Sequence, residues 1–318
     1  MPDHTPLHRD PFLTRRGFLG VVAGTLGASA LVACTKGDSA SDTAAASTDT
    51  GAAGATATSA SSGSGGNAGN GALALGLQLY TVRDQLQKDL DGTLAALAAA
   101  GYKHLESAGY AGKTAQEFKA ALDKHGLHVA SMHVPIAMIR DNPTQVLADA
   151  KLFGASWVVC PWLDEKDRTA AGFKATGETL AKVADQWKGE NIGVAYHNHD
   201  FEWKPLAGGK NGYDTLFEAA GDNVKSELDL YWATFAGQDP LALSRAHPGR
   251  IALAHAKDAK PGAKREMTDV GKGSIDFKTI LTQFKADGLK YAFVEYDNSP
   301  DPIASAKASL AHLDSLKV

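Results

Sequence analysis

Residues 156–160 (SWVVC), 170–190 (AAGFKATGETLAKVADQWKGE) and 192–197 (IGVAYH) form a strand–helix–strand unit in the sequence. The two outer segments are short and apolar, whereas the middle segment repeats apolar residues at helical spacing. Short apolar strands that flank a helix are typical of parallel strands with both faces covered. The unit therefore predicts a parallel sheet, and the same order of elements continues on both sides of it.

Outward from this unit, the pattern predicts eight strands, each followed by a helix. The expected strands are 73–80, 102–106, 127–133, 156–160, 192–197, 224–229, 250–255 and 291–295. The expected helices are 84–100, 114–125, one opened by Asn142-Pro143, 170–190, 213–220, 239–247, 276–287 and 302–316. Eight such units need about 250 residues, close to the length of residues 73–318, so we predict one (β/α)8 barrel. No G-x-G-x-x-G follows the first strand, which argues against a dinucleotide-binding sheet.

The composition excludes several classes of protein. Lys and Arg number 32 and Asp and Glu 36, giving a net charge of -4. General nucleic-acid-binding proteins usually carry a basic face instead. Two cysteines exclude a disulfide framework.

The first 33 residues read as an export signal. Residues 14–19 (TRRGFL) contain a twin-arginine motif, an apolar stretch follows to residue 33, and residues 31–34 (LVAC) resemble a bacterial lipobox. The apolar stretch is shorter than the span of about 20 residues that a membrane anchor needs, which favours cleavage. We therefore expect residues 1–33 to be a signal peptide and Cys34 to become a lipidated N-terminus.

Residues 34–72 are expected to be a disordered linker. From position 35 to position 72 there is no Val, Ile, Leu, Met or aromatic residue. Such a segment cannot bury enough apolar surface to offset its chain entropy. We predict a barrel of residues 73–318 that is exported by the twin-arginine route. It would be periplasmic or at the cell surface, and would meet the membrane only through the lipid at Cys34.

Polar side chains follow the C-terminal ends of the predicted strands, where barrels of this class place their active sites. They are Gln78, Tyr80, Glu106, His133, Trp162, His197, His199, Asp229, His255, Lys257, Glu295 and Asp297. Alternate strand residues share a face, so neighbouring strands present His, Asp, His and Glu together. This mixture of nitrogen and oxygen ligands suits one divalent ion such as Mn²⁺, Zn²⁺, Co²⁺ or Mg²⁺.

Six segments give the chain a family resemblance. They are residues 76–80 (GLQLY), 196–203 (YHNHDFEW), 227–232 (ELDLYW), 255–258 (HAKD), 271–277 (GKGSIDF) and 294–297 (VEYD). Together they resemble the sugar phosphate isomerase/epimerase family, which has a xylose-isomerase-like barrel and includes inosose dehydratases. The resemblance implies a carbohydrate substrate and one divalent metal ion.

The resemblance also implies ligands. Members typically hold the metal with a carboxylate after strand five and with Asp, His and Glu after strands six to eight; the last three match Asp229, His255 and Glu295. Strand five ends in a His-Asn-His run instead, so His199 is assigned as the replacement ligand and His197 as its neighbour, with an exchange of the two left open. Glu106 could also supply the carboxylate. A histidine in place of a glutamate argues against epimerisation by two opposed carboxylates.

The expected chemistry is removal of the proton next to a carbonyl group through an enediolate. Glu295, Glu106 or His197 could be the base. Lys257 could hold an oxyanion or a hydroxyl, or could pair with Asp258 or Glu295 instead. Isomerisation, epimerisation and loss of a β-substituent by a lyase or dehydratase all start from this intermediate, and the sequence leaves them open.

Gln78, Tyr80, His133, Trp162 and Trp203 are candidates for substrate binding, with packing inside the barrel as the alternative for the aromatic rings. Gly271-Lys272-Gly273 could be a loop over the site, although a neutral sugar fits an exported protein better than a sugar phosphate. Two other functions remain to be separated from this one. A sugar-binding lipoprotein without turnover would not need the metal cluster, and an apurinic-site endonuclease would need several zinc ions and a surface suited to DNA.

Overall fold

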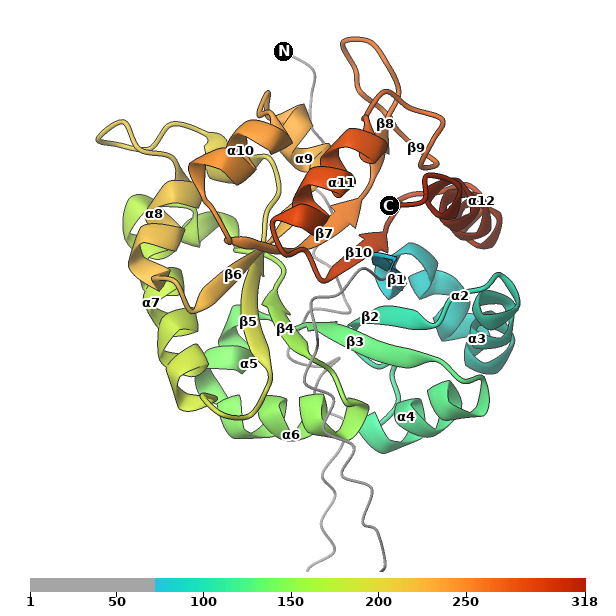
Figure 1. The fold of residues 1–318 in the computed structure, drawn as a ribbon. Coiled ribbons are helices and arrows are strands. Elements are labelled where there is room, and N and C mark those ends of the chain that lie inside the picture. The colour runs from blue at the N-terminus through green and yellow to red at the C-terminus, as the bar shows by residue number, and fades with distance from the viewer. Residues whose placement is uncertain (1–71) are drawn as a thin grey trace, which may run out of the picture. The chain divides into compact units, whose positions relative to one another are not determined.

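The computed structural model describes residues 72–318, which form a closed barrel of eight parallel strands (Figure 1). The barrel order is β1-β10-β7-β6-β5-β4-β3-β2. The strands are β1 (Ala74–Gln78), β2 (His104–Ala108), β3 (His128–His133), β4 (Trp157–Cys160), β5 (Gly193–His197), β6 (Val224–Asp229), β7 (Ile251–Ala256) and β10 (Tyr291–Val294). The predicted (β/α)8 barrel is confirmed, and all eight predicted strands are present with ends that move by at most two residues.

Helices lie around the outside of the barrel (Figure 1). The main ones are α2 (Arg83–Lys88), α3 (Leu90–Ala99), α4 (Ala115–Lys124), α6 (Pro143–Phe153), α7 (Ala170–Gln186), α8 (Gly212–Ala220), α10 (Pro240–Ala246), α11 (Phe277–Ala286) and α12 (Pro302–Ser315). Local signals set their ends. Thr114 and Glu117 form a capping box that opens α4, and Gly154 closes α6 in the left-handed conformation with φ +67°.

One predicted helix is interrupted. The segment expected to be helical over residues 84–100 forms α2 and α3, with a break at Asp89. Asp89 has φ -150° and its side chain accepts a hydrogen bond from the backbone N–H of Gly92. An aspartate in this role starts a new helix rather than continuing the previous one.

Short elements that the periodicity did not predict follow the C-terminal ends of three strands. Helix α5 (Ile136–Asp141) follows β3, and α9 (Leu230–Phe235) follows β6. After β7, β8 (Asp258–Ala259) and β9 (Met267–Thr268) pair as an antiparallel hairpin. Three 3-10 turns, η1 (Leu79–Val82), η2 (Glu165–Asp167) and η3 (Phe201–Trp203), follow β1, β4 and β5. All of these lie in the loops that would shape an active site.

The interior of the barrel is apolar in one part and polar in another. Ala130, Val159, Ala195, Leu253 and Phe293 form a small buried cluster of their own, distinct from the larger core between strands and helices. Two glycines make room for large rings. A Cβ atom at Gly76 would lie 2.5 Å from Phe293, and one at Gly193 would lie 2.3 Å from Trp157. The polar part of the interior lies at the strand ends and is described below.

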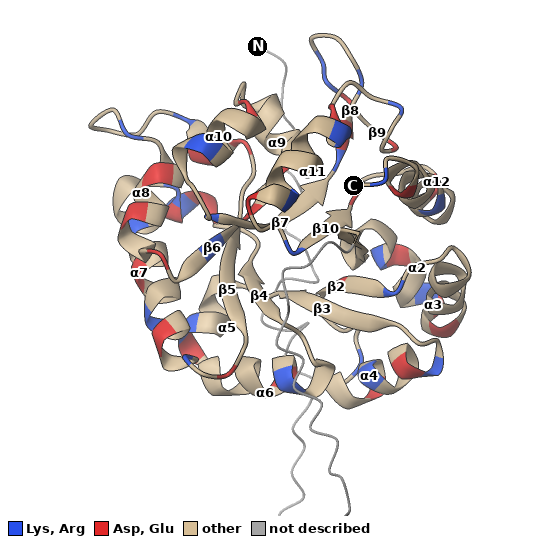
Figure 2. Ribbon diagram, viewed as in Figure 1, with Lys and Arg blue, Asp and Glu red and all other residues tan. Residues whose placement is uncertain are grey.

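Charged residues of both signs are spread over the outer helices (Figure 2). A search of the described helices finds none with the length and apolarity needed to cross a membrane. The predicted signal peptide, Cys34 and the linker up to residue 71 lie outside the described residues.

Candidate active site

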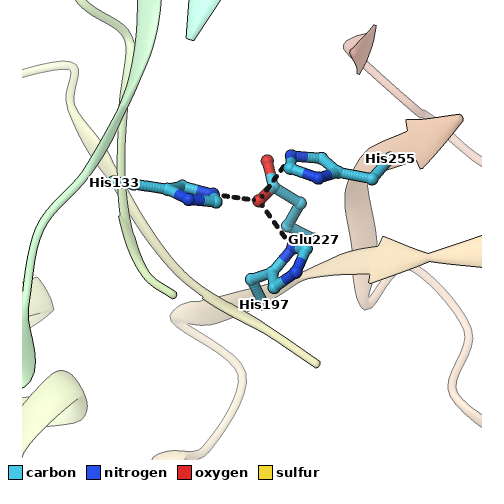
Figure 3. A group of neighbouring side chains, drawn as sticks. All are labelled: His133, His197, Glu227 and His255. Carbon is cyan, nitrogen blue, oxygen red and sulfur yellow. Dashed lines mark hydrogen bonds and ion pairs between the residues drawn. The ribbon is translucent and has the colours of Figure 1, made fainter. Parts of the chain in front are cut away.

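Three imidazoles surround one buried carboxylate at the end of the barrel interior (Figure 3). Oε2 of Glu227, on β6, lies 2.7 Å from Nε2 of His133, 3.1 Å from Nδ1 of His197 and 3.1 Å from Nε2 of His255. The histidines come from β3, β5 and β7, so four strands converge on one point. Glu227 was not among the predicted site residues. Its position two residues before Asp229 on the same strand face was the available signal.

Glu106 lies beside this group and is fully buried. Its Oε2 is 2.6 Å from Nε2 of His255 and accepts a hydrogen bond from Nε2 of Gln78 at 2.8 Å. Its Oε1 accepts from the hydroxyl of Ser131 at 2.6 Å. Both carboxylate oxygens are therefore occupied by protein groups, and Glu106, held by Gln78 and Ser131, orients His255.

The other side of His255 faces a second acidic group. Its Nδ1 is 2.7 Å from Oε2 of Glu295 and 4.0 Å from Oδ2 of Asp229. One ligand atom from each of these three residues lies within 4.8 Å of the others. The structure thus brings together the three residues that the sequence analysis placed at the ends of strands six, seven and eight.

Lys257 is buried among carboxylates. Its ammonium group lies 3.2 Å from Asp229, 2.8 Å from Glu295 and 2.8 Å from Asp297. The side chain is 2% exposed. Of the two ion pairs considered from the sequence, the one with Glu295 is present, whereas the carboxylate of Asp258 accepts hydrogen bonds from backbone N–H groups instead.

Asp258 binds the loop that contains the G-K-G segment. Its Oδ2 accepts hydrogen bonds from the backbone N–H groups of Gly271 and Gly273, both at 2.9 Å. Its Oδ1 accepts from Ile275 and Ala259. These N–H groups could have cradled a phosphate, but a carboxylate of the protein already occupies them.

Burial and neighbouring charges move the pKa values of the cluster in opposite directions. Burial lowers the pKa of His133, but the carboxylates of Glu106 and Glu227 outweigh it and raise that pKa to about 9. Burial, followed by the positive charge of His255, holds the pKa of His197 well below its usual range. Burial raises the pKa of Asp229 to about 6. The site therefore offers both neutral and cationic imidazoles.

The residues present fit a divalent metal ion. Oδ2 of Asp229 is buried and, apart from its ion pair with the ammonium group of Lys257 at 3.2 Å, makes no hydrogen bond to any residue in the described part of the chain. It faces Nδ1 of His255 and, at 3.8 Å, Nε2 of His197. Imidazole nitrogens and carboxylate oxygens without thiolates suit Zn²⁺, Mn²⁺, Co²⁺ or Mg²⁺. Three buried carboxylates contact Lys257 (Asp229, Glu295 and Asp297) and two more contact the histidines (Glu106 and Glu227), so a bound cation would offset part of their charge.

Of the two histidines after strand five, the structure brings His197 into the cluster. His199 belongs to neither group of candidate ligands found among residues 72–318. Its ring packs instead against aromatic rings, with centroid separations of 4.7 Å to Trp162, 5.6 Å to Phe201 and 5.6 Å to Trp232.

The aromatic candidates are dispersed. Trp162 borders His199 at the mouth of the barrel. Trp203 stacks on Tyr213 of α8 with a centroid separation of 5.3 Å. The ring of Tyr80 lies 3.9 Å from the guanidinium carbon of Arg83. Only Trp162 is placed next to the histidines by these contacts.

Glu202 is a buried residue of the site region that the sequence analysis did not single out. Its carboxylate accepts hydrogen bonds from the hydroxyl of Tyr196 at 2.7 Å and from the backbone N–H of His199 at 2.9 Å. Burial raises its pKa to about 8. Glu202 fixes the turn that carries His199 against strand β5. Its place inside the YHNHDFEW segment was the only sequence signal.

Comparisons with known proteins place the barrel in a family. The profile of the family described as "Xylose isomerase-like TIM barrel" matches residues 94–316. An inosose dehydratase of Lacticaseibacillus casei is 25% identical over 224 residues, which cover 64% of this chain and 72% of that protein. A sugar phosphate isomerase/epimerase from Parabacteroides distasonis ATCC 8503 superposes with a TM-score of 0.67 at 23% identity, covering 78% of this chain and 96% of that chain. The IOLI protein, solved with a bound zinc atom, superposes with a TM-score of 0.58 at 16% identity over 77% of this chain and 99% of that chain.

Proposed function

Because the chain belongs to the xylose isomerase-like TIM barrel family, we propose that it is a divalent-metal-dependent enzyme of the isomerase/epimerase type. It would remove the proton next to the carbonyl group of a carbohydrate or keto-sugar. The observation that supports this most directly is the buried set of Asp229, His255 and Glu295, whose ligand atoms lie within 4.8 Å of one another.

Asp229, His255 and Glu295 would hold the ion, together with His197. When bound, the ion supplies a Lewis acid that polarises a carbonyl group and stabilises negative charge on oxygen. Glu106 and Glu227 both contact Nε2 of His255 and fix the orientation of its ring. Partners of this kind usually make a ligand imidazole more basic.

Glu295 is the best placed base. It is 5% exposed, whereas Glu106 is fully buried and engaged by three donors. Glu295 would take the proton from the carbon next to the carbonyl and hold it on a carboxylate oxygen. The ammonium group of Lys257, beside Glu295, would stabilise the charge that develops on the substrate oxygen. Return of the proton to the neighbouring carbon, together with transfer of the hydroxyl proton to the former carbonyl oxygen, completes an isomerisation.

Dehydration is the second candidate, and the inosose dehydratase relative favours it. It begins with the same proton abstraction. The carbon–oxygen bond of the β-hydroxyl then breaks, a carbon–carbon double bond forms, and the hydroxyl leaves as water after taking up a proton. His197 stands at the end of β5, where the family resemblance implies a carboxylate, and this argues against epimerisation by two opposed ligand carboxylates. This favours outcomes that need one base.

Solvent deuterium distinguishes these outcomes. The metal-loaded protein is incubated in deuterated water with a panel of free sugars, 3-keto sugars and glycosides, followed by NMR and mass spectrometry. Deuterium at a carbon next to the carbonyl in an isomeric product would support isomerisation, and an unsaturated product that has lost water would support dehydration. Absence of exchange with every substrate, in a protein that binds no metal, would favour a sugar-binding protein instead.

Substitutions of the proposed ligands test the metal assignment. We expect His255→Ala and Glu295→Ala each to lose bound metal and activity while keeping the circular dichroism spectrum of the fold. His125→Ala, at the end of α4 on the outside of the barrel, is the matched control and should keep both. Wild-type metal content and turnover in both site variants would contradict the assignment.

A further inference from the structure

We propose that His199 and Trp232, with the ring of Trp162, form a subsite for a neutral carbohydrate beside the acidic cluster, and that His199 binds a substrate hydroxyl rather than the metal ion. This inference rests on the proposed function for its substrate class. It assigns to His199 a role different from the ligand role expected from the sequence.

Two buried polar atoms at the mouth of the barrel point to a missing ligand. Nδ1 of His199 and Nε1 of Trp232 are buried and find no hydrogen-bond partner among residues 72–318. The indole N–H can only donate, whereas an imidazole nitrogen can donate or accept according to its tautomer. Buried polar groups normally form hydrogen bonds. Two that have no partner among the described residues, side by side at the mouth of the barrel, therefore indicate a site for a ligand with hydrogen-bonding groups.

The aromatic rings of His199, Trp232 and Trp162 lie around these two nitrogen atoms. The centroids of His199 and Trp232 are 5.6 Å apart with their planes inclined by 39°. Trp162 stands perpendicular to His199 at 4.7 Å. Both tryptophans are only partly buried, so part of each ring remains accessible. Partly exposed aromatic rings offer surfaces on which the C–H face of a sugar ring can pack.

The protein holds this arrangement in place before any ligand arrives. Glu202 fixes the backbone of His199, and Asp229 accepts a hydrogen bond from the backbone N–H of Trp232 at 2.8 Å. The guanidinium carbon of Arg168 lies 4.3 Å from the ring centre of Trp162. Side chains fixed in this way lose little conformational entropy when they bind a ligand.

The subsite adjoins the candidate metal centre. The rings of His197 and His199 are 5.0 Å apart, and the ammonium group of Lys257 lies 5.9 Å from the ring centre of Trp232. A ligand that contacts His199 and Trp232 would therefore have further atoms within reach of the acidic cluster. A single substrate molecule could then contact the subsite and the candidate metal centre at the same time.

The surroundings select the chemistry of that ligand. A hydroxyl group can accept from Trp232 and can either donate to or accept from His199. A neutral polyol or sugar, with hydroxyl groups and an apolar face in one molecule, satisfies the nitrogen atoms and the rings together.

The test uses calorimetric titration of the metal-loaded protein with myo-inositol and with methyl β-D-glucopyranoside, which lack a free carbonyl group. His199→Phe removes the imidazole nitrogens and Trp232→Phe removes the indole N–H, and both variants keep an aromatic ring. Each should weaken binding of the better probe about 5- to 10-fold. Metal content, measured by mass spectrometry, should remain that of the wild type. Trp157→Phe, in the barrel interior away from this mouth, is the matched control and should bind as the wild type does.

Three results would overturn the inference. They are loss of the metal ion in His199→Phe, wild-type affinity in both variants, and absence of saturable binding of either probe to the wild type. The proposed function can fail separately. If binding depends on His199 and Trp232 but the protein exchanges no proton with any keto-sugar, the subsite is supported and the proposed enzymatic function is contradicted.

Discussion

At the residue scale, the position of Lys257 is the most informative feature of the site. A buried ammonium group is stable only when it is paired, and this one contacts three carboxylates. Two of those carboxylates, Asp229 and Glu295, are also candidate metal ligands. The lysine therefore supplies positive charge to the same oxygen atoms that a divalent ion would bind.

Replacing Lys257 should separate its effect on metal affinity from its effect on turnover. We expect Lys257→Met to bind Mn²⁺ or Zn²⁺ more tightly, by about tenfold or more, because a competing positive charge is lost. Turnover should fall about 100-fold or more, because the substrate oxyanion loses a donor. Calorimetry and steady-state kinetics would measure these changes. Lys272→Met, on the exposed side of the loop, is the control, and weaker metal binding in Lys257→Met would contradict this account.

Glu202 provides a prediction about pH. Its pKa is raised to about 8 in the folded protein, against an ordinary value of 4.5. Between these two values the folded state holds a proton that the unfolded state has lost, so the contribution of Glu202 to stability falls as pH rises and levels off above about 8. Glu202→Gln should match the wild type near pH 4 and should gain relative to it toward pH 8, by on the order of 4 kcal/mol at most.

Urea unfolding of both proteins at several pH values measures this difference. Tyr196 and the backbone of His199 can both still hydrogen-bond to the glutamine amide, so the comparison isolates the ionisation. A difference in unfolding free energy that does not change between pH 4 and pH 8 would contradict the raised pKa.

At the scale of elements, the loop after β7 is fixed by one side chain. Asp258 accepts hydrogen bonds from Gly271, Gly273 and Ile275, and the hairpin of β8 and β9 lies within the same loop. A Cβ atom at Gly273 would lie 2.1 Å from Oδ1 of Asp258, so this close approach requires glycine. The loop is therefore held in a fixed conformation at the barrel mouth, next to Lys257.

Asp258→Asn should loosen this loop. The amide NH₂ cannot accept the two glycine N–H groups, so we expect a loss of about 2 kcal/mol and a fall in Tm of about 4–8 °C. Limited proteolysis should then cut within residues 260–275 sooner than in the wild type. Asp164→Asn, on an exposed turn, is the matched control. Equal stability and equal cleavage in Asp258→Asn and this control would show that the carboxylate does not fix the loop.

At the scale of the whole molecule, the export signal remains a prediction from the sequence. We expect Arg15→Lys together with Arg16→Lys to leave the protein in the cytoplasm, because the twin-arginine pair is read by a receptor. Cys34→Ser should be exported but should lose its lipid. Fractionation and mass spectrometry of the mature N-terminus would show this. An N-terminus that still carries residues 1–33 in the exported wild type would contradict the proposed cleavage.

The sequence by itself determined the barrel. Alternation of short apolar strands with helices is a local pattern, and eight such units in this length leave few ways to bury every apolar face. It also determined that Asp229, His255 and Glu295 would meet, because parallel strands bring their C-terminal ends to the same edge. The break at Asp89 was not predicted, because its side chain caps a new helix there, and the loop helices are too short to show a periodic pattern.

Only the tertiary structure placed His197, and not His199, in the acidic cluster. Alternation places both on one face only while the chain is a strand, and β5 ends at His197. The chain then turns into η3, so His197 points into the acidic cluster and His199 packs among aromatic rings. In the same way, the carboxylate that lies among the three imidazoles, Glu227, depends on distances between strands. A pattern along one chain contains no information about those distances.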